Sequence, residues 1–206
     1  MAFPRLLTFF AVLSAFTLSG CPMGPKPYLK SGFVPPRRVA VLPMDNHTND
    51  LNGPDVVRYW FDQRLREKKG YQTVSLDEID EKLKEIGIND GGQLAAVPLP
   101  KLAALFSADA VIYGDLLNFD YQTTGFLNIR KVKASFKMVE SKTGDTLWQA
   151  EGLGANSEGG ISSKAALQLG LKSLGIQLVE KAANSPLKTE TWDMIWNAIE
   201  DLPPAR

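Results

Sequence analysis

The sequence predicts an α/β fold that leans toward α+β: a single three-layer-like domain in which helices flank a mixed sheet of about five strands. Two observations predict it. Short, nearly continuous apolar runs at residues 39–43 and 110–117 are typical of buried strands. Between them, residues 54–69 carry apolar side chains at three- and four-residue spacing, as a helix with one buried face does. The 206 residues, 44% of them apolar, suffice for one compact core.

The first half of the domain contains three expected helices and a short strand. Pro54 opens the first helix and Gly70 closes it. A strand at residues 71–74 follows. Residues 75–78 have the Ser-x-x-Glu pattern of a capping box, so a second helix begins there. Pro100 stands where the first turn of a third helix accepts proline.

The second half contains a pair of strands joined by a turn. Residues 131–140 alternate between apolar and polar side chains, which is the pattern of a strand with one solvated face. Ile129 is out of phase with this pattern and predicts a bulge or bend near Arg130. The partner strand covers residues 146–150, and the glycine-rich residues 152–160 then predict a mobile connection.

Two helices are expected at the carboxyl end. Leucines recur at three- and four-residue steps over residues 167–178 and predict a long helix. Trp192 and Trp196 lie on the apolar stripe of a final short helix. No internal repeat and no further boundary are evident, so residues 38–206 are expected to form one domain.

The first twenty residues are typical of a signal peptide. Arg5 precedes thirteen mostly apolar residues, a run too short to span a bilayer. Ser19, Gly20 and Cys21 then resemble the lipobox of bacterial lipoproteins. The resemblance implies cleavage between Gly20 and Cys21, a diacylglyceryl thioether on the sulfur and acylation of the new amino terminus. The less favoured alternatives are a buried helix that ends in cysteine and an ordinary signal peptide with an incidental thiol.

The predicted segments are thus a lipoprotein signal peptide at residues 1–20, a lipidated tether at residues 21–37 and the domain. The tether is rich in proline, which predicts an extended chain. Docking of Phe33 and Val34 on the domain or on a neighbour is the less favoured alternative. Because Pro22 rather than Asp follows the cysteine, the sorting rule of enterobacterial lipoproteins favours the outer membrane. Whether the domain faces the periplasm or the cell exterior stays open.

Composition argues against several classes of function. The 23 basic and 23 acidic side chains balance, so no broad positive field is available for nucleic acid. One His and one Cys complete neither a Cys/His zinc site, nor a thiol–imidazole pair, nor a disulfide. We therefore expect no metal, no cofactor apart from the covalent lipid, no nucleic-acid partner and no enzymatic activity.

One loop gathers several polar side chains that offer oxygen or nitrogen donors. Asp45, Asn46, His47 and Thr48 follow the first predicted strand, where open α/β sheets often bind ligands. No glycine-rich phosphate loop accompanies them. Asn and Asp at such positions more often form local turns with the backbone, so the turn is the favoured interpretation and a ligand site the alternative.

The two tryptophans of the last helix are candidates for a partner interface. Trp192 and Trp196 are large, amphipathic side chains of the kind that anchor subunit contacts or sit at a membrane surface. Packing against the domain's own sheet is the somewhat favoured alternative.

Several short motifs occur in a characteristic order. They are residues 39–43, 46–48, 70–71, 87–90, 93–94, 108–114 and 143–148. Their order resembles a family of bacterial lipoproteins related to the curli-export and Pel-polysaccharide-export lipoproteins, whose neisserial members are surface antigens. The resemblance implies an α/β domain similar to the amino-terminal domain of the Tol-system β-propeller protein. It further implies outer-membrane attachment, in several relatives a ring of subunits serving export, and no catalytic residues.

One feature departs from the curli-export pattern. Membrane-spanning strands need about 9 to 11 residues with an apolar face, whereas Lys131, Lys133 and Lys137 line one face of the expected hairpin and residues 121–130 are polar. A pore formed by this chain alone is therefore disfavoured.

The expected function is that of a non-enzymatic lipoprotein anchored to the outer membrane. It would assemble with copies of itself or with another envelope lipoprotein to support secretion or export. The alternative is a periplasm-facing module that binds a ligand or glycan, and an enzyme is the least favoured class.

Overall fold

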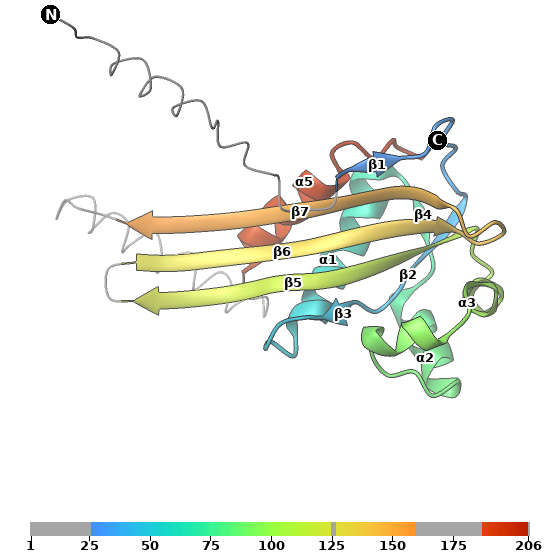
Figure 1. Cartoon of the computed structure of the whole chain (residues 1–206), viewed down its shortest axis with the longest axis horizontal. Coiled ribbons are helices and arrows are strands. Elements are labelled where there is room, and N and C mark those ends of the chain that lie inside the picture. The colour runs from blue at the N-terminus through green and yellow to red at the C-terminus, as the bar shows by residue number, and fades with distance from the viewer. Residues whose placement is uncertain (1–25, 125–126, 160–186, 206) are drawn as a thin grey trace, which may run out of the picture.

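The computed structural model describes residues 26–124, 127–159 and 187–205. These residues form a mixed sheet with helices on both faces (Figure 1), which confirms the predicted fold class. The elements, in chain order, are β1 (Tyr28–Leu29), β2 (Arg38–Val41), β3 (Asp45–Asn46), α1 (Gly53–Lys69), β4 (Gln72–Thr73), α2 (Leu76–Glu85), the 3-10 helix η1 (Gly91–Ala96), α3 (Leu99–Phe106), β5 (Ala110–Thr124), β6 (Leu127–Glu140), β7 (Thr146–Gly159) and α5 (Lys188–Ile199).

The sheet has the order β1-β7-β6-β5-β2-β4, with β3 beside β5. β2 runs parallel to β4 and β5, whereas β5, β6 and β7 form an antiparallel meander. The described part of the chain has seven strands where about five were expected. The two additional strands, β1 and β3, have two residues each, which is too short to leave an alternating pattern in the sequence.

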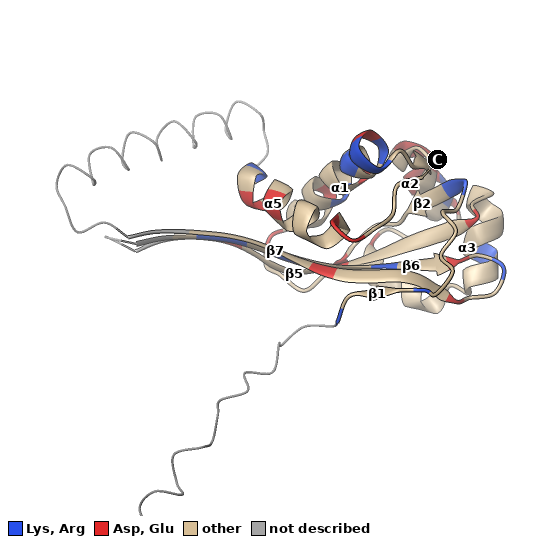
Figure 2. Cartoon of the chain, turned by 90° about the horizontal axis from the view of Figure 1, so that it is seen from above, with Lys and Arg blue, Asp and Glu red and all other residues tan. Residues whose placement is uncertain are grey.

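Two separate cores lie on the two faces of the sheet. On one face, α1 and α5 pack over the sheet (Figure 2), and Phe61 of α1 stacks on Phe136 of β6 with 4.0 Å between the ring centroids. On the other face, α2, η1 and α3 cover β2, β4 and the start of β5. Both faces of β2 are therefore buried, as its continuous apolar run predicted. The three predicted helices of the first half are confirmed as α1, α2 and α3.

The meander strands are much longer than the apolar patterns indicated. Beyond β2 and β3 they continue side by side (Figure 1), and we call residues 118–124, 127–133 and 153–159 the arm. The expected mobile connection after residue 152 is wrong: residues 152–159 belong to β7. The expected bulge near Arg130 is also wrong, because the register shifts instead between Leu116 and Asn118 and between Met138 and Val139.

Glycines allow α5 to approach β7 closely. A Cβ atom at Gly152 would overlap the carbonyl group of Met194, and one at Gly154 would overlap the carbonyl group of Glu190. Glycine weakens a strand by its flexibility, yet here it creates the space for a helix backbone. The predicted final helix is thus confirmed as α5, whereas the helix predicted over residues 167–178 lies outside the described residues.

A buried ion pair holds the same helix to the arm. Arg130 of β6 donates from Nε to Oε1 of Glu190 at 2.7 Å and from Nη2 to Oε2 at 3.2 Å. The two side chains are only 8% and 2% exposed. Two parallel bonds of this kind fix both position and orientation, so Glu190 sets the placement of the first turn of α5.

Part of the expected tether is attached to the domain. Tyr28 and Leu29 form β1, which pairs with Gln149 and Trp148 of β7. Phe33 packs against the core on the face of the sheet that α1 and α5 cover. Docking of Phe33, the less favoured alternative, is therefore what the structure shows, and the prediction of a free tether up to residue 37 is wrong for this stretch.

Acidification is expected to loosen β1. Lys30 donates a hydrogen bond to Asp145 at 2.8 Å, and this ammonium holds the pKa of the exposed carboxyl below its ordinary value. Because the folded-state pKa is lowered, the pair contributes fully at neutral pH and is lost as the pH falls from about 4 through the folded-state pKa. Hydrogen exchange of the Lys30 amide, which donates to the Leu147 carbonyl, reports this loss as falling protection relative to the intrinsic rate.

The control for this prediction is Lys30→Met, whose amide protection should be lower at neutral pH and flat across the same pH range. An equal pH dependence in wild type and variant would show that other groups control β1.

Candidate functional site

The polar loop after β2 lies beside the middle of β5. β3 pairs in parallel with β5 so that Asp45 stands opposite Asp115 and Asn46 opposite Leu116. The His47 amide then donates to the Leu116 carbonyl at 3.0 Å. These backbone bonds fix the loop against the sheet and bring its side chains to one place on the surface.

Three loop side chains serve the loop itself. Oδ1 of Asn46 accepts hydrogen bonds from the Thr48 amide at 3.0 Å and from its hydroxyl at 2.8 Å. Nδ2 of Asn46 donates to the Asp50 carbonyl at 2.9 Å. The Asp50 carboxylate accepts from the amides of Asn52 and Gly53 at the start of α1. The favoured turn interpretation is therefore what the structure shows for Asn46 and Thr48.

The other two predicted loop residues, Asp45 and His47, lie close to Asp115, which the sequence analysis missed. One donor atom each from Asp45, His47 and Asp115 lies within 4.8 Å of the others. His47 Nε2 and Asp45 Oδ2 are 3.6 Å apart. Ser135 of β6 donates its hydroxyl proton to Asp115 Oδ2 at 2.8 Å. The sequence pattern gives no hint of Asp115 because only the parallel register of β3 and β5 brings it to the loop.

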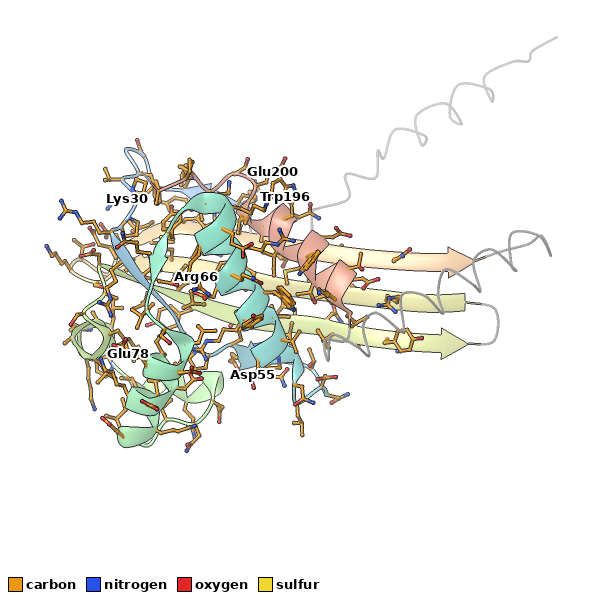
Figure 3. All side chains as sticks on the ribbon, turned by 180° about the vertical axis from the view of Figure 1, so that it is seen from behind. Lys30, Asp55, Arg66, Glu78, Trp196 and Glu200 are labelled. Carbon is orange, nitrogen blue, oxygen red and sulfur yellow. The ribbon has the colours of Figure 1, made fainter. Side chains whose placement is uncertain are left out.

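The two tryptophans of α5 have different environments. Trp192 meets Trp60 of α1 edge to face, with 5.3 Å between ring centroids, and the Arg64 guanidinium lies 4.4 Å above its ring. Trp196, which is labelled in Figure 3, is 53% exposed in contrast to Trp192, which is half-buried. A surface pocket of about 180 Å³ between α1 and α5 is lined by Arg64, Trp192, Asp193, Trp196 and Ile199. Trp192 thus packs within the domain, against α1 rather than the sheet, and Trp196 stays available to a partner.

The arm carries a strand edge that no described strand covers. β3 pairs with β5 only at Asp115 and Leu116, so residues 118–122, which we call the β5 edge, pair only with β6. The opposite edge of the arm belongs to β7, where β1 covers Trp148 and Gln149. Further along β7, Asn197 of α5 donates to the Leu153 carbonyl at 2.8 Å. Beyond Leu153, β7 likewise pairs only with β6 among the described residues, so the arm has an uncovered strand edge on each side.

The predicted lipidation site lies outside the described residues. Ser19, Gly20 and Cys21 all precede residue 26, so the structure does not test cleavage or acylation. Of the helices that are described, not one combines the length and the apolar character that crossing a bilayer requires.

Comparisons with known proteins bear on the class of the chain. A family model described as "Putative lipoprotein GNA1162-like" matches residues 28–193. A curated "Putative lipoprotein NMB1124/NMB1162" from Neisseria meningitidis serogroup B is 28% identical over 185 residues, which cover 88% of this chain and 82% of the relative.

The chain is also similar to solved structures. The crystal structure of lipoprotein GNA1162 from Neisseria meningitidis has a TM-score of 0.56 at 25% identity and covers 73% of this chain and 100% of that chain. A PelC dodecamer from Paraburkholderia phytofirmans has a TM-score of 0.43 at 15% identity and covers 82% of this chain and 89% of that chain, a likeness too distant to carry an inference about assembly.

Proposed function

The chain belongs to the GNA1162-like lipoprotein family, and from this premise we propose that it is a non-enzymatic lipoprotein of the outer membrane that acts by assembly. It would self-assemble through the β5 edge, alone or as an accessory component of an envelope secretion or export system. The membership supports lipid attachment, and the open strand edge supports assembly.

Attachment would occur through Cys21, the one cysteine of the chain. A diacylglyceryl thioether and an amide-linked acyl chain together give firm anchoring, because each buried methylene adds about 0.8 kcal/mol and a single acyl chain holds only marginally. Proline-rich residues between the cysteine and β1 would keep the domain away from the bilayer surface.

The β5 edge is the observation that carries the assembly proposal. A strand edge without a neighbour can accept a further strand, and proteins that stay monomeric usually protect such edges with charged side chains, lysine above all, or with proline. The sequence Asn-Phe-Asp-Tyr-Gln of residues 118–122 contains no lysine and no proline, and Asp120 is its one charged side chain. Two copies related by a two-fold axis would place β5 against its counterpart as an antiparallel pair, which continues the sheet from one subunit to the next.

Light scattering of acyl-free chain from residue 22 onward tests this proposal. We expect its mass to rise with concentration. The double variant Asn118→Lys, Gln122→Lys should weaken association about tenfold or more. Lysines that face each other across paired strands repel. A loss of about 1.4 kcal/mol in binding free energy is enough for a tenfold weaker association.

The matched control places the same two charges elsewhere, as Ala95→Lys and Ala104→Lys on exposed positions of η1 and α3. This variant should associate like the wild type. A wild-type chain that remains monomeric at high concentration, and that yields no crosslinked envelope partner, would refute the assembly role.

A further inference from the structure

We propose that Asp45, His47 and Asp115 bind a divalent zinc-type ion, with the remaining coordination positions open to water or to a ligand from a partner. We call these three residues the triad. The inference is independent of lipidation and of assembly, because it rests on the loop after β2 and on its pairing with β5.

The donor set selects the class of ion. The triad offers one imidazole nitrogen and two carboxylate oxygens. Imidazole suits zinc and neighbouring transition metals, whereas magnesium and calcium prefer oxygen donors alone. Catalytic zinc sites have three protein ligands and keep the fourth position for water or substrate. The triad therefore matches a zinc-type ion better than magnesium or calcium.

The spacing of the donor atoms fits a shared ion. Zinc lies about 2.0 to 2.2 Å from nitrogen and oxygen ligands, so two neighbouring ligands of a tetrahedral site are about 3.4 Å apart. His47 Nε2 and Asp45 Oδ2 are 3.6 Å apart, and all three donors lie within 4.8 Å. Small rotations of these side chains, of which His47 is exposed and the two aspartates are half-buried, would complete the geometry.

Charge supplies a second and separate argument. The parallel register places Asp45 and Asp115 directly opposite each other, an arrangement of like charges that destabilises a strand pair. Within the described ranges, no lysine or arginine forms an ion pair with either carboxylate, and His47 is the one basic side chain at Asp45. A bound divalent cation would turn this repulsion into attraction to a common centre.

Neighbouring groups hold the ligands in place. The Ser135 hydroxyl donates to Asp115 Oδ2 at 2.8 Å and leaves the other carboxylate oxygen for the ion. The His47 amide is tied to the Leu116 carbonyl. Supporting bonds of this kind orient ligands in metal sites.

Calorimetric titration of the full chain with zinc chloride tests the proposal. The chain is purified in detergent, and every sample carries Cys21→Ser so that no thiol competes for the metal. We expect saturable binding of one ion per chain and a rise in melting temperature when zinc is added, because an ion that binds only the folded state stabilises it.

His47→Ala and Asp115→Asn should each weaken zinc binding at least tenfold and abolish the zinc-dependent rise in melting temperature. In addition, Asp115→Asn should raise the melting temperature without zinc, because it removes the repulsion. The matched control Asp77→Asn changes an exposed acid in the first turn of α2, outside both the triad and the β5 edge, and should retain full binding. Absence of saturable binding, or binding of undiminished affinity in both triad variants, would overturn the proposal.

Discussion

Replacement of Gly154 by valine is expected to lower the free energy of unfolding by about 3 kcal/mol or more, at the upper end of what overpacking costs. The added side chain would collide with the Glu190 carbonyl, which belongs to helix backbone and cannot rotate away. The helix α5 would have to leave its place on β7, and contacts made by Met194 and Ile195 with the core would be lost together with it.

Urea denaturation of the purified domain measures this effect. Ala155→Val is the matched control, because it adds the same side chain one residue further along β7 at an exposed position. Exposed substitutions usually change stability by less than about 0.5 kcal/mol. Equal unfolding midpoints for the two variants would mean that α5 does not sit on β7 as the structure has it.

Removal of one partner of the buried ion pair is expected to have a similarly large effect. Glu190→Ala leaves the Arg130 guanidinium buried without its carboxylate, and breaking such a pair costs about 3 to 5 kcal/mol. The solvent-accessible pair of Glu78 and Lys82 provides the comparison. Glu78→Ala should cost much less than Glu190→Ala, because solvent screens the charges.

A double variant separates the charge from the packing. Arg130→Met combined with Glu190→Leu removes both charges and keeps apolar volume, so it should recover most of the stability that Glu190→Ala loses. Calorimetric melting of the wild type, of Glu190→Ala and of the double variant gives the comparison. A loss below about 1 kcal/mol in Glu190→Ala would contradict the burial of this pair.

Local patterns were sufficient to predict the body of the domain. The helix α1 is bounded by Pro54 and by Gly70, which adopts the left-handed conformation that closes a helix. The strand β2 was recognisable because both of its faces are buried at Val39, Ala40 and Val41, which are all apolar. These signals depend on neighbours within one turn or one strand, and a single sequence contains them in full.

The arm could not be predicted in the same way. Gly152 and Gly154 are typical of a loop when read alone, and their role becomes visible only once α5 lies against them. Arg130 stands in a polar stretch, yet it is buried by a glutamate sixty positions away. Asp115 joins Asp45 and His47 through strand register. Each of these features depends on contacts between distant segments, which periodicity does not encode.

Composition bears only on metal sites built from cysteine and histidine. One histidine and one cysteine do not complete a Cys/His site, but carboxylates are ligands too, and the fold places two of them beside the histidine. The expectation of no metal was based on the numbers of histidine and cysteine residues. It did not consider which carboxylates the sheet brings next to the histidine.

Assembly through the β5 edge is the central claim, and cysteine crosslinking in native membranes tests it most directly. Gln122→Cys places a thiol on the β5 edge, and a thiol-specific crosslinker should yield covalent dimers of this variant in intact envelopes. Ala104→Cys, at an exposed position of α3 outside the edge, should remain monomeric. Failure of the edge cysteine to link two copies, or equal dimer yields from both positions, would contradict the claim.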